Sequence, residues 1–552
     1  MSELFERLVR ARGISDSFLR QSYDDCLDPS VLPDYKQAIK RIKQAIKKEE
    51  KVLIYGDYDV DGVTASVVMH DGLKLAGVKE LEIMLPDRFL DGYGMSKKVV
   101  QHAKEAGASL VVTVDCGSGN SKIIEELKKN KVDVIVTDHH ECPEELPKAV
   151  AVVNPKRKDI AECVENWEKK AEALIDAREL AGVGVAFTLI RGLVKEGLIP
   201  EGKEKWLLDL VAIGTICDSM VLTGENRRLC YFGLIVLNKT RRLGLREIIR
   251  NIKVNKVNSE VVGFQIGPRL NAAGRMESAK KALGLLMATS RPEAAKLAGE
   301  LEVLNEERKK QQKLAVKDIR ERGLDDEPVI VAVGGWHEGI LGIVAGRLVE
   351  DCKRPAFVFT EKDGILKGSG RSFGDFNLAE ALEICREDII DGGGHAGACG
   401  VKVEKDKIED FKRKVNEYYR DLALYDQERY LEDEDDLELS YLSDLNLDFM
   451  EEMERLEPFG VGNEVPVFLL RDMDVVEARK MGADEQHIRL LVKDRDGGLM
   501  KLIAFNVPKK WFEIEPGAKV DIWAHIEVND WNGLRSVEGR ILKMILAREE
   551  YF

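Results

Sequence analysis

The sequence has few of the features that mark disordered, secreted or membrane-spanning chains. Only 15 prolines occur among 552 residues, which argues against extensive disorder. The most apolar runs, such as LLDLVAIGTIC, are far too short to cross a bilayer. The first fifteen residues contain no apolar segment of the kind found in signal peptides. We therefore expect a cytoplasmic protein without a membrane anchor.

Paired cysteines are also missing. The nine cysteines are scattered along the chain and include no Cys-x-x-Cys pair. This spacing argues against a disulfide framework and against a zinc knuckle. We expect most of the cysteines to be small buried hydrophobic residues.

Positive charge is scarce overall, because the formal net charge is −15. Phosphate binding requires lysine and arginine, so this value taken alone argues against a nucleic-acid ligand. A basic groove can nevertheless exist on an acidic protein. Two stretches, 36–51 and 308–322, are rich in Lys and Arg. Each can be a phosphate-binding surface or only the solvated face of a helix.

Short apolar runs and amphipathic stretches alternate between Lys51 and about Pro155. The runs KVLIY, SLVVTV, DVIVT and AVAVVN are apolar on both faces, as are strands of a parallel sheet. The stretches GMSKKVVQHAKEAG and SKIIEELKKNK between them are amphipathic and favour helices. The pattern predicts an α/β domain with a doubly wound parallel sheet.

The remainder of the chain predicts further domains, which its length allows. A long charged helix is expected from about Arg291 to Arg322, and a second, smaller α/β unit follows from about Glu327 to Tyr419. The acidic stretch YLEDEDDLEL predicts a solvated linker, and five strand-like runs after it predict a small β-barrel. The predicted boundaries are a catalytic domain with an N-terminal extension at 1–280, a connecting helix at 281–325, a second α/β domain at 326–425, an acidic linker at 426–440 and a barrel at 441–552.

Acidic and imidazole side chains follow three of the predicted parallel strands. VLIY leads into GDYDVDG, LVVTV leads into Asp115, and VIVT leads into Asp138, His139 and His140. Ligands of open α/β sheets bind beyond the carboxyl ends of the strands, so these groups are expected to converge there. Asp57, Asp59 and Asp61 of the first loop belong to the same set.

These residue types suit a divalent metal ion. Carboxylates favour Mg²⁺ and Mn²⁺, and imidazole shifts the preference toward Mn²⁺. The set exceeds the three or four protein ligands that one ion needs, and Asp218 can add another, which indicates two ions. A single Asp after a strand is more often a helix cap, but three successive strand ends make coincidence a poor explanation. A calcium-binding EF-hand is excluded, because position twelve of such a loop is Val68 rather than Glu.

Short motifs spread over nearly the whole chain carry a family resemblance. They include DHH at Asp138–His140, GDYDVDG, TVDCG, LAGVGVAF, GENR, FQIGPRLNAAGR, GWHEGILGIVAGRL, GSGRS, GGGHAGACG and EPFGVGN. In this order the motifs resemble those of the RecJ branch of the DHH phosphoesterase superfamily. Each motif is short, but the ordered set is specific.

The resemblance implies a DHH catalytic domain, a DHH-associated domain and a C-terminal OB-fold. It implies a 5′→3′ exonuclease that hydrolyses single-stranded DNA to 5′-mononucleotides with two Mn²⁺ or Mg²⁺ ions, in DNA repair and recombination. A repair helicase or a single-strand-binding protein is an expected partner, and a monomer is the expected state. By matching motifs, the implied catalytic metal ligands are Asp59, Asp61, Asp115, His139, His140 and Asp218, with Asp57 as an additional candidate.

The predicted substrate-binding residues lie outside the metal loops. Arginine binds phosphate in a bidentate manner, and glycines allow backbone N–H groups to approach phosphate. The residues predicted to bind substrate are Arg269, Asn271, Arg275, Arg371, Ser372, Gly393, Gly394 and His395, the glycines being expected in a turn at Gly392–Gly394. Trp336, Phe505, Trp523 and Trp531 are candidates for stacking on bases or, equally, for core positions.

The sequence departs from the family pattern at a few places. Tyr55 stands where some relatives carry a His, a charged segment fills 156–180, and Gly397 and Cys399 replace a bulkier residue and Ala. Two other functions remain open. One is a DHH phosphodiesterase for small substrates, which would usually lack an OB-fold. The other is an inactive scaffold, which would have lost metal ligands. The motifs leave the choice between DNA and RNA open.

Overall fold

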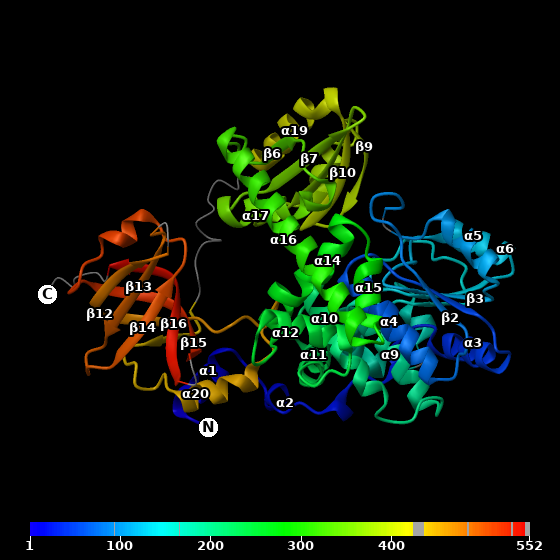
Figure 1. Cartoon of the computed structure of the whole chain (residues 1–552), viewed down its shortest axis with the longest axis horizontal. Coiled ribbons are helices and arrows are strands. Elements are labelled where there is room, and N and C mark those ends of the chain that lie inside the picture. Colours follow the sequence, from blue (N-terminus) through cyan, green and yellow to red (C-terminus); the bar gives the residue numbers. More distant parts are fainter. Residues whose placement is uncertain (93, 165, 423–434, 483–484, 532–533, 547–552) are drawn as a thin grey trace. The chain divides into compact units, whose positions relative to one another are not determined.

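The computed structural model describes residues 1–92, 94–164, 166–422, 435–482, 485–531 and 534–546. Figure 1 shows the elements coloured along the sequence. The chain forms two compact units. One consists of Asp28–Asp218 and Gly233–Leu431, and the other of Met1–Leu27, Ser219–Phe232 and Glu432–Phe552.

The larger unit begins with a five-stranded parallel sheet in the order β2-β1-β3-β4-β5. Its strands are β1 (Val52–Tyr55), β2 (Leu81–Met84), β3 (Leu110–Val114), β4 (Asp133–Thr137) and β5 (Ala151–Val153). The direction in which successive strands are added reverses between β1 and β3. In doubly wound sheets this switch point opens the crevice in which ligands bind.

Four of these strands match the sequence prediction, and β2 was missed. The four residues of β1 are buried, whereas those of β2, at the edge of the sheet, are only half-buried. A run as short as LEIM, with Glu82 inside it, gives little of the apolar signal that marks a buried parallel strand.

Helices cover both faces of this sheet and continue beyond it, as the predicted doubly wound architecture requires. They are α3 (Tyr35–Lys47), α4 (Val60–Leu75), α5 (Lys97–Ala106), α6 (Ser121–Lys129), α7 (Ile160–Cys163), α8 (Ala171–Arg178), α9 (Gly182–Lys195), α10 (Leu208–Cys217), α12 (Leu243–Ile252), α13 (Ser259–Val261), α14 (Gly267–Met276), α15 (Lys280–Met287) and α16 (Arg291–Glu321). Most residues of α4 and α9 are buried, so these two helices form the centre of the domain. The charged segment at 156–180 contains α7 and α8.

The predicted connecting helix is α16, which spans 31 residues. A second sheet follows it in the order β6-β7-β8-β10-β9. Its elements are β6 (Ile330–Gly334), α17 (Leu341–Cys352), β7 (Ala356–Lys362), β8 (Ile365–Arg371), α18 (Leu378–Ile384), β9 (Ile389–Gly394), β10 (Ala398–Glu404) and α19 (Ile408–Asp421). Helix α17 packs on one face of the sheet, and α18 and α19 pack on the other.

The prediction of a turn at Gly392–Gly394 is wrong. These glycines end strand β9, which pairs with β10 in an antiparallel hairpin. A glycine run resembles a turn in the sequence, but here it forms a strand whose pairing with β10 supplies the backbone hydrogen bonds.

The smaller unit contains the predicted barrel. Its strands are β11 (Leu437–Leu439), β12 (Phe468–Met481), β13 (His487–Lys493), β14 (Leu499–Ala504), β15 (Lys519–Trp531) and β16 (Leu534–Leu546). Pairing of β12 with β15 closes the ring β12-β13-β14-β16-β15. All five predicted strand runs are present. The last residues of the expected acidic linker form β11 instead, while 426–434 lies outside the described residues.

The N-terminal residues belong to the barrel unit, contrary to the predicted catalytic domain at 1–280. Helix α1 (Glu3–Ala11) buries Leu4, Phe5 and Leu8 in the same hydrophobic core as the barrel strands. Helices α2 (Asp16–Leu19), α20 (Leu447–Met453) and the start of α11 (Gly224–Leu237) lie in the same unit. The sequence shows that α1 is amphipathic but not which core receives its apolar face.

In the described part of the chain, no helix combines the length and apolar character that crossing a membrane requires.

The basic stretch at 36–51 contains α3, and one of its arginines has a structural role. Arg41 is buried and pairs with Asp133 and Glu50, each at 2.6 Å. It also donates to the backbone carbonyl of Ser109 at 3.2 Å. Arg41 therefore fastens α3 to the edge of the sheet from which β3 and β4 begin.

Replacement of this arginine is expected to destabilise the larger unit. Arg41→Ala leaves the carboxylate of Glu50, which is only 12% exposed, and the carbonyl of Ser109 without this partner, which costs about 3 kcal/mol. The measurement is chemical unfolding followed by circular dichroism. The adjacent, exposed Lys40→Ala serves as control and is expected to change stability by less than about 0.5 kcal/mol. Equal effects of the two substitutions would contradict the structural role of Arg41.

Candidate metal centre

The loop after β1 provides three carboxylates. Asp59 is the N-cap of α4, and its Oδ1 accepts the backbone N–H of Gly62 at 3.0 Å. Asp61 lies in the first turn of α4 and is buried. It accepts the N–H groups of Gly182 and Val183 at 2.7 and 2.9 Å. These two residues begin α9, so the positive end of that helix supports the buried carboxylate.

The ends of β3 and β4 bring further ligands to the same place. Asp115 follows β3 with a φ of 60°, in the left-handed region that few residues other than glycine adopt. His139 Nε2 lies 3.1 Å from Asp115 Oδ1, 3.9 Å from Asp61 Oδ2 and 3.7 Å from Asp218 Oδ2. Asp218 is the C-cap of α10. Carboxylates from three different segments therefore surround one imidazole nitrogen.

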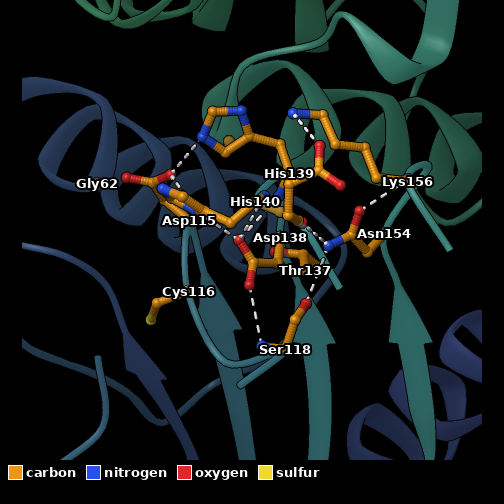
Figure 2. A network of polar contacts seen from close by, with 12 residues as sticks. Gly62, Asp115, Cys116, Ser118, Thr137, Asp138, His139, His140, Asn154 and Lys156 are labelled. Atoms are coloured by element: carbon orange, nitrogen blue, oxygen red, sulfur yellow. Dashed lines mark hydrogen bonds and ion pairs between the residues drawn. The ribbon is translucent and has the colours of Figure 1, made fainter. Parts of the chain in front are cut away.

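Asp138 does not join this cluster but orients the histidines (Figure 2). Its Oδ2 accepts the N–H of Ser118 at 2.9 Å, and its Oδ1 accepts from the N–H of His139 and from His140 Nδ1 at 2.8 and 2.9 Å. Asn154 donates to the carbonyl of His140 at 2.8 Å. This contact orients the imidazole ring of His140, which is grouped with Asp115 and His139 as a potential metal ligand.

Asp138 differs electrostatically from the other aspartates. Burial alone would raise its pKa, but the hydrogen bond and charge of His140, together with the N–H of Ser118, lower that pKa below the ordinary value. Burial would lower the pKa of His140, and Asp138 raises it. Asp138 therefore stays ionised as the anion that holds His140.

The clustered carboxylates repel one another. Burial, and then the charge of Asp59, raise the pKa of Asp61 to about 7. Burial, and then the charge of Asp61, raise the pKa of Asp218 to about 9. The pKa values of Asp57 and Asp115 are raised in the same sense, again by burial first and neighbouring carboxylates second. Such a cluster is unfavourable unless protons or cations neutralise it.

A divalent metal ion fits this cluster. Three overlapping groups each hold three potential ligand atoms within 4.8 Å of one another. The groups are Asp115, His139 and His140; Asp61, His139 and Asp218; and Asp57, Asp59 and Asp115. Oδ1 of Asp57 is buried and has no hydrogen-bond partner among the described residues. The structure thus brings all seven predicted ligands together, in a number suited to two ions.

Two glycines make room for this arrangement. A Cβ atom at Gly182 would lie 2.6 Å from the side chain of Asp115, and one at Gly214 would lie 2.8 Å from Asp61 Oδ1. At these two positions the backbones of α9 and α10 lie so close to the carboxylates that no side chain would fit.

Arg88 and Arg275 lie close to the acidic cluster, and Arg371 lies near both of these arginines. Of the three, Arg88 was not predicted. Burial, and then the charges of Arg88 and Arg371, lower the pKa of Arg275 to about 9, so it remains protonated at neutral pH. Arg88 lies 5.1 Å from the ring centroid of Tyr58, in the metal loop. Within the described residues no carboxylate lies within 4.0 Å of any of the three. Crowded, unpaired guanidinium groups favour a bound anion such as phosphate.

No motif or basic cluster in the sequence indicates Arg88, because it is the only basic residue of the loop LPDRFLDG. The structure fixes that loop through Asp87, whose side chain accepts the N–H groups of Phe89 and Leu90 at 2.9 and 3.1 Å. The ring of Phe89 also meets that of His337 at 5.5 Å. His337 and the half-buried Trp336 follow β6, between this strand and α17.

The other predicted substrate-binding residues have varied surroundings. Arg269 is paired with Glu302 at 2.6 Å, so its charge is already compensated. Ser372 donates its hydroxyl to the carbonyl of Phe376. His395 and Gly393 are exposed, and Asn271 is half-buried. Their contact with substrate remains a prediction.

Models of three known domain families match successive parts of the chain. The model of the DHH family N-terminal domain matches residues 51–215, that of the DHHA1 domain matches 326–421, and that of the RecJ OB domain matches 436–543.

Similar proteins extend over nearly the full chain. The single-stranded-DNA-specific exonuclease RecJ of Bacillus subtilis is 38% identical over 544 residues, which cover 97% of this chain and 66% of that protein. The enzyme of the same name from Haemophilus influenzae is 32% identical over 97% of this chain and 95% of its own length. The crystal structure of RecJ with Mn²⁺ from Thermus thermophilus superposes with a TM-score of 0.79 at 27% identity, covering 99% of this chain and 76% of that one.

Loss of any one clustered ligand is expected to abolish metal binding and hydrolysis. Asp61→Ala, Asp115→Ala and His140→Ala should each reduce Mn²⁺-dependent phosphodiester hydrolysis at least about a hundredfold, because each side chain belongs to the cluster that would hold the ions. Calorimetric Mn²⁺ titration and circular dichroism test binding and folding. The control is His102→Ala, a histidine of the same domain on α5. Substantial activity in a ligand variant would overturn the assignment.

Removing one repelling carboxylate is expected to stabilise the metal-free protein. The pKa of Asp218 is raised from 3.8 to about 9, so the folded state loses stability as the pH rises between these values. Metal-free Asp218→Asn should therefore melt at a higher temperature than the parent at pH 8, and the difference should shrink toward pH 5. Titration of the histidines changes the stability of both proteins similarly, so it largely cancels in the difference between their melting temperatures. Saturating Mn²⁺ should reverse the order, because the variant has lost a ligand.

Equal melting temperatures of the two metal-free proteins at pH 8 would show that Asp218 is not crowded by the other carboxylates.

Proposed function

Because this chain belongs to the RecJ family of DHH phosphoesterases, we propose that it is a metal-dependent exonuclease that hydrolyses phosphodiester bonds of single-stranded DNA. The observation that carries the proposal is the position of the acidic cluster. Seven potential ligands meet at the switch point of the parallel sheet, next to arginines without carboxylate partners. Metal ligands beside unpaired guanidinium groups suit a phosphodiester substrate.

The chain's own residues would divide the chemistry between them. Asp57, Asp59, Asp61, Asp115, His139, His140 and Asp218 would hold two Mn²⁺ or Mg²⁺ ions. Bound ions of this kind supply a hydroxide at neutral pH and neutralise charge on phosphate oxygens. Asp138 keeps His140 in the orientation that binding needs.

The arginines would act on the substrate. Arg371 lies at the end of β8, where Nη1 donates to the carbonyl of Gly370 at 2.8 Å, which fixes the direction of its guanidinium. Arg371, Arg88 and Arg275 would bind the non-bridging oxygens of the scissile phosphate and its neighbour, and stabilise the charge that develops during attack.

The barrel domain favours a polymeric substrate over a small one. An OB-fold typically binds about 4–16 nucleotides, which is longer than a dinucleotide substrate. Phe505 is 59% exposed beside His487, so it is available for stacking, whereas Trp523 is buried. The side chain of Trp531 lies outside the described residues. An inactive scaffold is disfavoured because every potential ligand is present.

Finer properties are part of the proposal. We place the enzyme in the cytoplasm, acting from the 5′ end toward the 3′ end and releasing 5′-mononucleotides, in DNA repair and recombination. Docking of a repair helicase or a single-strand-binding protein, and action as a monomer, remain predictions.

A direct assay tests the function and its polarity. The full chain with Mn²⁺ is incubated with single strands labelled at either end, and with a duplex and an RNA of the same sequence. The proposal expects immediate release of the 5′ label as a mononucleotide and little cleavage of the duplex. Initial release of the 3′ label, or activity only on dinucleotides, would refute it.

Substitution of the phosphate-binding residues is expected to separate substrate binding from metal binding. Arg371→Ala and His395→Ala should lower kcat/KM about ten- to a hundredfold. This factor corresponds to the loss of one hydrogen bond to a charged phosphate oxygen. Calorimetric Mn²⁺ affinity should stay unchanged, because neither residue belongs to the ligand cluster. Arg347→Ala, an exposed arginine on α17, is the control. Loss of Mn²⁺ affinity in either variant would refute this division of roles.

A further inference from the structure

A second basic region lies in the DHH domain, away from the metal centre. The segment Lys239–Lys256 holds seven Lys or Arg residues and one acid, Glu247, in a chain whose net charge is −15. The structure folds this segment around an open cavity of about 860 Å³. Five cations line the cavity and no carboxylate does: Lys239, Arg241, Arg246, Arg250 and Lys253.

These cations are exposed, and most have no partner of opposite charge. Arg250 pairs with Glu247. Across the described ranges, no carboxylate lies within 4.0 Å of Lys239, Arg246 or Lys253. Cations near a helix C-terminus also stabilise the helix dipole, but that effect needs only one or two of them and no cavity.

Three of these cations lie on one side of α12. Arg246, Arg250 and Lys253 are spaced by four and three residues along α12 and its C-cap, so they share one face of the helix. Three positive charges along one helical face repel one another unless an anion lies between them.

The loop that carries the other two cations is held rigidly. Thr240 Oγ1 donates to the buried Asp209 at 2.6 Å, and Arg242 pairs with Asp209 at 3.4 Å and with Asp71 at 2.9 Å. Lys239 and Arg241 project from this anchored loop. A fixed backbone lowers the entropy that binding would otherwise cost.

An aromatic ring adjoins the cations. The guanidinium of Arg241 lies 3.5 Å from the ring centroid of Trp206, a tryptophan with 36% of its surface exposed. Arg241 also lines a neighbouring cavity of about 430 Å³ together with Trp206 and Lys74. A stacked arginine and tryptophan beside a row of cations is the combination that single-stranded nucleic acids bind.

Helix α4 sets the separation from the metal centre. Asp61 lies in its first turn, and Lys74 lies in its last turn, thirteen residues later. At about 1.5 Å per residue the two are about 20 Å apart, at opposite ends of the helix. A strand stacked at about 3.4 Å per nucleotide would cover this separation with about six nucleotides.

We propose that this region, Lys239, Arg241, Arg246, Arg250 and Lys253 with Trp206, is a second binding site for the sugar–phosphate backbone of single-stranded nucleic acid. It would hold a part of the strand that is not being cleaved and would keep long substrates bound between successive cleavages. The nature of the strand rests on the proposed function. The binding site itself requires no metal.

The test is a salt titration of binding with the full chain, in EDTA, so that no hydrolysis occurs. Fluorescence anisotropy compares oligothymidylates of about 30 and about 6 nucleotides. The variant is Arg246→Glu/Lys253→Glu, and the matched control is Lys104→Glu/Lys128→Glu, which makes the same charge change on exposed positions of α5 and α6.

The variant is expected to bind the long strand at least about tenfold more weakly. Because two phosphate contacts are lost, its slope of log K against log salt concentration should become shallower by about 1.4. Affinity for the short strand and Mn²⁺-dependent hydrolysis of it should be unchanged, which also shows that the variant is folded. The control should match the parent.

Several outcomes would overturn the proposal. They are an unchanged slope in the variant, an equal loss for long and short strands, an equal loss in the control, or a loss of affinity for polyglutamate with DNA binding intact. The last result would assign the cavity to an acidic protein. A parent chain that hydrolyses no single strand would instead refute the proposed function, while binding in EDTA would still report on this site.

Discussion

Repulsion among buried carboxylates is the constraint around which the catalytic domain is organised. Asp57, Asp61, Asp115 and Asp218 meet in one buried region, and the pKa of each is raised by burial and by its neighbours. Such a cluster is unfavourable unless protons or cations neutralise it, and several features of the fold support it. The N-terminus of α9 donates two N–H groups to Asp61, glycines let helices approach the carboxylates closely, and Asp115 adopts a left-handed backbone conformation.

The histidines are supported in a different way. Asp138 is surrounded by donors, so its pKa falls while the others rise. It can therefore act as a permanent anion that orients His140, although it stands next to two of the ligands in sequence. The DHH motif thus contains two kinds of residue. Asp138 orients a histidine, and His139 and His140 lie among the potential metal ligands. The surroundings of the aspartates differ, since Asp138 is paired with His140, whereas Asp61 accepts two N–H groups but lies among other carboxylates.

Positive charge is distributed to complement this cluster. On a chain of net charge −15, arginines without carboxylate partners gather near the ligands, from the loop after β2, from α14 and from the second α/β domain. A separate group of cations lines the cavity beside α12, at the other end of α4. Other cations, such as Arg41 and Arg269, are paired with carboxylates. These two local groups of cations offer surfaces to a polyanion that the net charge does not reveal.

The sequence by itself determined the metal loops, because strand ends followed by Asp and His must converge when the strands are parallel. It also determined the long helix α16 and the five barrel strands, whose periodicities are strong and local. Only the tertiary structure decided the rest. Strand β2 is short and half-buried, the glycines of β9 resemble a turn, and α1 could have packed on any apolar surface, so pairing and burial settled all three. Arg88 and the α12 cations depend on the neighbours that folding supplies. Whether a cation is compensated or free is a property of distances in space, and spacing along the chain does not contain it.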